Sequence, residues 1–262
     1  MKKILSMLAL ALAMACQPQK EPVSQNFLAL FNGKDMDGWT PKFAGHEAGL
    51  NYKNTFRVED GILKVKYDEY DSFRNEFGHL FFKQSFSSYR LRIEYRFVDG
   101  APPGAPDWAF MNSGVMVHSQ NIESMGLDQE FPVSLEAQFL GGTAELPRST
   151  GNLCTPGTHV TIADTLTTIH CIDAITKTYP AGEWVNVEII AFSDSLLHHV
   201  VNGDTVMTYT HPVIGGEYLP INFPLAEGAP LKGGYIALQS ESHPIEFRKV
   251  ELLDLSKKNN GF

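Results

Sequence analysis

SYRLRIEYRF, residues 88–97, alternates apolar and polar side chains from Tyr89 onward without a break. The apolar positions include Leu91, Ile93, Tyr95 and Phe97, and the polar positions are Arg90, Arg92, Glu94 and Arg96. A period of two residues is typical of a β-strand that buries one of its faces. The stretch therefore predicts a strand with one face in the core and a strongly charged face toward solvent.

Similar short runs lie at residues 185–191, 196–201, 234–239 and 245–253. The pair Asn202-Gly203 predicts a tight hairpin turn, because both residues tolerate a positive φ. After the first sixteen residues, no window of eleven or more residues has the apolar period of an amphipathic helix. Many short strands with turn signals between them predict an all-β sandwich or barrel, built as a single domain over residues 27–255.

The first sixteen residues have the order of a secretory signal: a basic start, an apolar run, and small residues before Cys16. The apolar run is about ten residues long, too short to span about 30 Å of hydrocarbon as a helix. Cys16 at the cleavage point is typical of a bacterial lipobox, in which the thiol is acylated, and an ordinary signal peptide with a chance cysteine is the alternative. We expect a lipoprotein signal over 1–16, a flexible tether over 17–26 and a polar tail over 256–262.

This order predicts a bacterial cell-envelope protein that is lipid-anchored, either facing the periplasm or exposed on the outer membrane. The net charge of −9 argues against nucleic acid or an anionic membrane surface as the partner, since both need a basic patch. The membrane is therefore expected as a partner only through the lipid. The sequence implies no cofactor, and it leaves a divalent metal ion and the oligomeric state open.

Besides Cys16, only two cysteines are present, Cys154 and Cys171. In an oxidising compartment an even pair is most simply a disulfide, which here would stabilise the fold by about 3 kcal/mol through loop closure. A metal site with the nearby His159 and His170 is the alternative, although the spacing matches no zinc pattern.

Polar side chains follow the outward face of three predicted strands. They are Arg92, Glu94 and Arg96 on the first, His118 beside Met116 on the second, and Glu136 and Gln138 on the third. If these strands are neighbours, the side chains form one patch. Two long loops, 99–112 and 141–158, border these strands, and Trp108 in the first loop is the best candidate to stack on a sugar ring. A solvated sheet face with incidental ion pairs is the alternative.

An ordered series of motifs resembles the 3-keto-disaccharide hydrolase family. The series is LFNGKDMDGW (30–39), FRVEDGIL (56–63), 89–97, NSGV (112–115), LEAQ (135–138), GEWVN (182–186), 197–206, 234–239 and FRKV (247–250). The resemblance implies a concanavalin-like jelly-roll sandwich of two antiparallel sheets. Many members have Leu-Gln-Asp-His-Gly near the end, where this chain has Leu238-Gln239-Ser240-Glu241-Ser242. Glu241 thus stands at the position of the family's His, as a candidate substrate contact.

The resemblance also implies a substrate whose glucosyl 3-hydroxyl has been oxidised to a ketone. A base can then remove the C2 proton, and the resulting enolate expels the C1 substituent. His118 is the candidate base, Glu136 the alternative base or the acid, and Arg92 or Arg96 the donor to the enolate. Direct hydrolysis would instead use two carboxylates, here Glu136 and Glu94.

On the predicted disulfide loop, Asn152, Thr155 and His159 either contact substrate or brace the loop. Three functions remain at this point. A carbohydrate-active hydrolase or lyase for 3-keto glucosides is the first, a non-catalytic carbohydrate-binding lipoprotein is the second, and a structural envelope protein is the third. A buried, convergent acid–base cluster would favour the enzyme, and a shallow aromatic strip would favour the binding protein.

Overall fold

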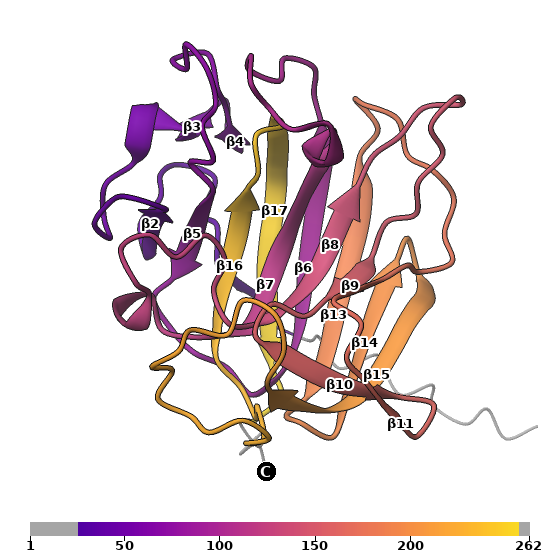
Figure 1. Cartoon of the computed structure of the whole chain (residues 1–262). Helices are drawn as coiled ribbons and strands as arrows, with labels where there is room; N and C mark the ends of the chain where they lie inside the picture. Colours follow the sequence, from indigo (N-terminus) through magenta and orange to yellow (C-terminus); the bar gives the residue numbers. More distant parts are fainter. Residues whose placement is uncertain (1–25, 257–262) are drawn as a thin grey trace, which may run out of the picture.

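A computed structural model describes residues 26–256 of the 262-residue chain. The predicted signal, nearly all of the tether and most of the polar tail lie outside these residues. Within them, strands form two antiparallel sheets of ten and seven strands that pack face to face, which confirms the predicted sandwich (Figure 1). The same residues contain no helix long and apolar enough to cross a membrane.

The ten-stranded sheet is called the large sheet. Its order is β11 (Thr165–Thr167), β10 (Thr158–Ile162), β15 (Asp204–Ile214), β14 (Leu196–Val201), β13 (Val185–Phe192), β6 (Ser88–Phe97), β17 (Ile245–Asp254), β4 (Ile62–Val65) and β3 (Phe56–Glu59), with β1 (Leu28–Ala29) paired to β17.

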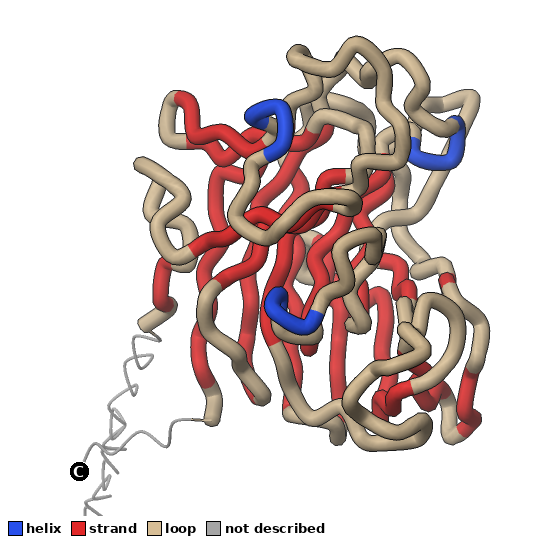
Figure 2. Tube along the Cα trace, turned by 60° about the vertical axis from the view of Figure 1, so that its left-hand side comes forward, coloured by secondary structure: helices blue, strands red, loops and turns tan. Residues whose placement is uncertain are grey.

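The seven-stranded sheet is called the small sheet. Its order is β12 (Cys171–Ile172), β9 (Asn152–Cys154), β8 (Leu135–Leu140), β7 (Asn112–Ser119), β16 (Tyr235–Ser240), β5 (Gly78–Phe82) and β2 (Trp39–Phe43). Three short 3₁₀ helices lie in the loops: η1 (Tyr52–Asn54), η2 (Asp107–Ala109) and η3 (Ile122–Ser124) (Figure 2).

Strand β6 is central to the large sheet, between β13 and β17, and spans the residues predicted for it. Its apolar side chains are buried between the sheets, and Tyr95 stacks on Phe139 of β8 with ring centroids 4.3 Å apart. The hairpin at Asn202-Gly203 is also confirmed, with φ of 49° and 97° between β14 and β15. Period-two alternation therefore defines the core. In the central strands of the small sheet, the face that does not contact the large sheet points outward.

The two long loops are only partly irregular. The first contains η2, and the second contributes β9 to the small sheet before the chain crosses into β10 of the large sheet. The disulfide between Cys154 and Cys171 is present and confirms the predicted pairing. It joins β9 to β12 at directly opposed positions, so the end of the small sheet is covalently closed.

Candidate active site: a carboxylate cavity on the small sheet

The outer face of the small sheet carries the candidate site, because alternation turns its polar residues away from the core. In β8, Leu135, Ala137 and Phe139 are buried between the sheets, so Glu136 and Gln138 point outward. Glu136 lies opposite Met116 of β7 and Cys154 of β9 in the strand register. The carboxylate of Glu136 lies over Gly114, where any Cβ would collide with it, so this glycine makes room for the acid.

Loops close over this face and leave a cavity of about 260 Å³, called here the carboxylate cavity. It is lined by Phe77, Trp108, Asn112, Glu130, Phe131, Glu136, Gln138, Cys154, Pro156, His170, Cys171, Tyr218 and Glu241. The lining comes from the small sheet and the residues that flank its strands, from the loop that holds η2, from the segment before β8, from the long segment between β15 and β16, and from the turn after β16. A cavity with aromatic walls and a few converging polar groups is typical of a small-molecule site.

One wall of the carboxylate cavity is a continuous series of aromatic rings. Neighbouring centroids are 5.7 Å apart for Trp108 and Phe77, 5.3 Å for Phe77 and Phe131, 5.4 Å for Phe131 and Tyr218, and 5.0 Å for Tyr218 and His170. Trp108 remains 55% exposed at the mouth. The sequence-based choice of Trp108 as a stacking residue therefore fits its position.

Of the three glutamates in the lining, the two buried ones are Glu136 on β8 and Glu241 in the turn after β16. Both residues are buried, with 6% and 4% of their surface exposed. Within residues 26–256, Glu136 Oε1 and Glu241 Oε2 have no hydrogen-bond partner. A buried polar atom without a partner costs stability, so such atoms gathered in one cavity indicate a ligand site.

Burial raises the pKa of Glu136 to about 8. Burial also raises the pKa of Glu241, and the nearby charge of Glu136 raises it further. The guanidinium of Arg148 opposes this shift, because a cation favours the ionised form of Glu241. Arg148 is held in place by a 2.9 Å hydrogen bond from Nη2 to the carbonyl of Met111. The pair therefore retains a proton at neutral pH, and Arg148 is the cation that favours ionisation of Glu241.

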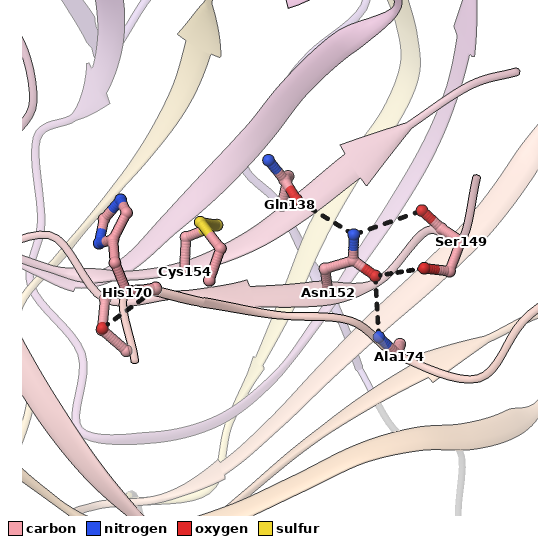
Figure 3. Close-up of a disulfide and its surroundings, with 8 residues drawn as sticks. Gln138, Ser149, Asn152, Cys154, His170 and Ala174 are labelled. Atoms are coloured by element: carbon pink, nitrogen blue, oxygen red, sulfur yellow. Dashed lines mark hydrogen bonds between the residues drawn. A yellow bond between two sulfur atoms is a disulfide. The ribbon is translucent and has the colours of Figure 1, made fainter. Parts of the chain in front are cut away.

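Gln138 is oriented by a residue behind the cavity (Figure 3). Asn152 Nδ2 donates a 3.1 Å hydrogen bond to Gln138 Oε1, which turns the amide nitrogen of Gln138 away from Asn152. Asn152 Oδ1 itself accepts bonds of 2.9 Å from Ser149 Oγ and from the backbone N–H of Ala174. Asn152 does not line the cavity, so its position favours the bracing role over the substrate contact.

The disulfide supports the cavity wall beside Glu136, and both of its cysteines are part of the lining. Next to it, the carbonyl of His170 accepts a 2.8 Å hydrogen bond from the backbone N–H of Thr155 (Figure 3). Thr155 is thereby a bracing residue, and it holds the segment that brings the His170 ring against Tyr218.

Sequence reasoning missed several polar residues on this face. His79 of β5 and Gln239 of β16 are opposed in register and fully buried, and in the described chain the side-chain nitrogen and oxygen atoms of both lack hydrogen-bond partners. Burial, together with the charge of Lys42, lowers the pKa of His79 to about 3. Asn112 Oδ1 is likewise unpartnered and lines the cavity. A lone polar residue in an apolar strand, as in GHLFF, is the signal, but only the loop positions show that this face is covered.

The prediction that Arg92, Glu94 and Arg96 join this cavity is wrong. They lie on β6, whose inner face packs against the small sheet, so their side chains emerge on the far side of the sandwich. Arg92 pairs with Glu188 at 3.1 Å, and Arg96 pairs with Glu246 at 2.6 Å. Glu94 pairs with Lys249 at 2.7 Å and also contacts Arg248. These are the ion pairs of a solvated sheet face, as the alternative predicted.

His118 does not lie in the carboxylate cavity either, and the reason is local. Opposite the stretch from Tyr235 to Ala237 of β16, the paired strand β7 has one residue more. His118 lies in this irregular part of β7 and adopts a φ of 50°. This β-bulge turns the ring inward. There Nδ1 lies 3.0 Å from the Tyr89 hydroxyl and Nε2 lies 3.1 Å from the Ser193 carbonyl. Burial lowers the pKa of His118 to about 4, so it is not a base poised near neutrality.

His159 is also outside the site, because its strand β10 belongs to the large sheet. It lies opposite Val213 of β15, and its ring packs against Gly215 and Gly216. The metal-site alternative for the cysteines has no counterpart, since both sulfurs are in the disulfide. No three or more His, Cys, Asp or Glu side chains between residues 26 and 256 are grouped to hold a metal ion.

Comparison with known proteins agrees with this architecture. The model of the 3-keto-alpha-glucoside-1,2-lyase-like domain matches residues 26–253. A solved structure from Parabacteroides distasonis ATCC 8503, provisionally named a glycosyl hydrolase, is 19% identical with a TM-score of 0.55, covering 87% of this chain and 94% of that chain. A second from the same organism, named likewise, is 17% identical with a TM-score of 0.52, covering 88% and 100%.

These two structures share the fold. No curated protein matches the chain. Because the family model covers nearly the whole described part, the chain belongs to the 3-keto-disaccharide hydrolase family, that of 3-keto-alpha-glucoside-1,2-lyase-like domains.

Proposed function

We propose that this protein cleaves the glycosidic bond of 3-keto glucosides in the carboxylate cavity. The observation that carries the proposal is the pair of buried carboxyl groups, Glu136 and Glu241, with unpartnered oxygens beside an aromatic wall. The family description, which names a 1,2-lyase, supports the substrate and favours elimination over hydrolysis.

In the proposed reaction, the C3 ketone acidifies the proton on C2, and the Glu241 carboxylate removes it. The electron pair moves to the ketone oxygen as an enolate and then returns to form the C1–C2 double bond while the C1–O bond breaks. Glu136 gives its proton to the departing oxygen, which leaves as an alcohol. Water adds across the double bond in a later step and releases 3-keto glucose.

The cation near Glu241 supports this assignment of roles. Arg148 favours the ionised form of Glu241, which suits the base, against burial and the charge of Glu136, which raise its pKa. A pKa of about 8 keeps Glu136 protonated at neutral pH, as the acid requires. The amide nitrogen of Gln138, oriented by Asn152, is the proposed donor to the enolate oxygen.

The test is a turnover assay with a 3-keto glucoside and its unoxidised parent. We expect the wild type to cleave only the keto compound, because the parent has no acidic C2 proton. Glu136→Gln and Glu241→Gln should each lower kcat by about 10²-fold or more. Glu94→Gln, which changes a carboxylate on the opposite face, is the matched control and should keep the wild-type rate. Full activity in both cavity variants would overturn the site.

The second candidate function is carbohydrate binding without catalysis, which the exposed Trp108 at the cavity mouth favours. The burial of both carboxyl groups argues for the enzyme, since a binding surface has no need of acids with raised pKa values. Binding of unmodified glycans without turnover of any keto sugar would establish the binding protein instead.

We further propose that the protein is a lipid-anchored envelope protein. The order of residues 1–16, ending in Cys16, supports the anchor, although these residues lie outside the described part of the chain. The disulfide supports an oxidising compartment, where such bonds persist.

A further inference from the structure

The carboxylate cavity is too small for a glycoside with a bulky group at C1, and this observation extends the proposed function, on which the inference below rests. Its volume is about 260 Å³. Pockets that enclose a drug-sized ligand measure roughly 300–1,000 Å³. The cavity therefore has room for the reacting sugar ring, and the group attached at C1 must extend beyond it.

A second hollow of about 580 Å³, called here the outer hollow, adjoins the carboxylate cavity. The two share Glu130, Phe131 and Tyr218 as lining residues. The Phe131 and Tyr218 rings meet edge to face, so they form the boundary between the two spaces. A substrate that places its sugar ring on one side of this boundary reaches the outer hollow with the group at C1.

The composition of the outer hollow indicates what it would hold. Leu219, Ile221 and Phe223 line it, and Ile221 is fully exposed at its rim. No Lys or Arg is among its lining residues in the described chain, whereas Asp128 and Glu130 are. The hollow therefore disfavours anionic groups such as sugar phosphates.

Much of the polar lining of the outer hollow is already engaged within the protein. Gln129 Nε2 donates to Gln120 Oε1 at 3.0 Å and to the Phe131 carbonyl at 2.8 Å. Ser124 Oγ donates to the Asn121 carbonyl at 2.7 Å. Few side-chain donors remain for the oxygens of a second sugar, while the apolar side chains remain uncovered.

We propose that the outer hollow is the leaving-group subsite and that it selects an uncharged aryl aglycone over a second sugar. Ile221 is the residue that contacts the aglycone face. The aryl group packs against apolar side chains across the Phe131–Tyr218 boundary while the keto ring stays beside Glu136 and Glu241.

The test measures kcat/KM for three 3-keto glucosides whose leaving groups are methanol, phenol and glucose. The aryl-to-methyl ratio is compared between the wild type and Ile221→Ser, so that the intrinsic reactivity of each leaving group cancels. We expect this ratio to fall by about threefold to tenfold in the variant, from lost apolar contact. Ile175→Ser is the matched control: Ile175 is similarly exposed but lines neither hollow, and the ratio should not change.

An unchanged aryl-to-methyl ratio in Ile221→Ser would overturn the inference. A fall confined to the glucosyl-to-methyl ratio would also overturn it, since the outer hollow would then hold a sugar. If the wild type cleaves none of the three compounds, the proposed function falls and this inference with it. Cleavage with unchanged ratios rejects the subsite alone, which keeps the two failures distinct.

Discussion

Arg148 acts on the pKa of Glu241 from outside the cavity lining. Its guanidinium lowers the pKa of Glu241, against the opposing effects of burial and of Glu136. Arg148→Met removes this cation, so the pKa of Glu241 should rise and the base should ionise only at higher pH. We expect the acidic limb of the kcat/KM–pH profile to move to higher pH, as measured on a 3-keto glucoside. Arg148→Lys keeps the charge and should keep the limb; an unmoved limb in Arg148→Met would contradict the role of Arg148.

Glu136 should make the fold less stable as pH rises. Its pKa is about 8 in the folded chain and about 4.3 when unfolded, so between these values the folded state alone holds the proton. Unfolding then releases a proton, and the free energy of unfolding falls by up to about 1.4 kcal/mol per pH unit. Glu136→Gln should therefore gain stability over the wild type between pH 5 and 8, measured by urea unfolding.

Glu94→Gln is the control of opposite sign. Lys249 and Arg248 lower the pKa of Glu94 despite some burial, so its contribution is present above the ordinary pKa of a glutamate and is lost in acid. This variant should lose stability relative to the wild type at neutral pH and recover toward it as the pH falls.

A stability difference between Glu136→Gln and wild type that does not vary with pH would contradict the raised pKa of Glu136.

At the level of single residues, the sequence predicted which side chains of β6 and β8 leave the core but not which residues they contact, and it misplaced His118. Glu136 and Gln138 were predictable because β8 alternates without a break. Glu241 followed from its place in the family motif. Arg148 and His79 were not predictable, since their importance depends on burial and neighbours that no local pattern encodes.

The bulge in β7 is the element whose geometry decides the role of His118. His118→Asn keeps a residue type that tolerates a positive φ and removes the hydrogen bond to Tyr89. We expect the free energy of unfolding to fall by about 1–3 kcal/mol, because the buried Tyr89 hydroxyl loses its partner. The kcat/KM for a 3-keto glucoside should stay near the wild-type value. A large loss of activity with normal stability would instead restore His118 to the reaction.

Strand positions were largely predictable from the chain, whereas strand neighbours were not. The runs at 88–97, 185–191, 196–201 and 245–253 all form strands within a residue or so of their predicted ends. Alternation shows which side chains share a face of a strand, but it does not show which sheet the strand joins. The polar faces of β6 and β8 were therefore merged into one patch, although they lie on opposite sides of the sandwich.

At the scale of the whole molecule, the predicted attachment to a membrane has a direct test. Cys16 follows the signal-like segment and is the expected site of acylation. Metabolic labelling with a fatty acid should label the wild type, and Cys16→Ala should lose the label and leave the membrane fraction. A wild-type protein without label would end the proposal, while the cavity and its chemistry would be unaffected.

The architecture of the sandwich explains why the proposed active site lies on the outer face of the small sheet. Its large sheet has an ion-paired outer surface, and its small sheet, closed at one end by the disulfide, carries the buried acids under the covering loops. The fold and the family were predictable from the ordered motifs. The cavity was not, because it forms only where loops distant in the sequence meet over the same sheet.

The most direct test of the central claim is proton NMR of a 3-keto glucoside incubated with the protein in D₂O. Elimination through an enolate removes the C2 proton, and later addition of water places solvent deuterium at C2. We predict release of the leaving group with deuterium at C2 of the keto sugar, at a rate that Glu241→Gln lowers by about 10²-fold or more. Cleavage that retains the C2 proton, or no cleavage at all, would contradict the account.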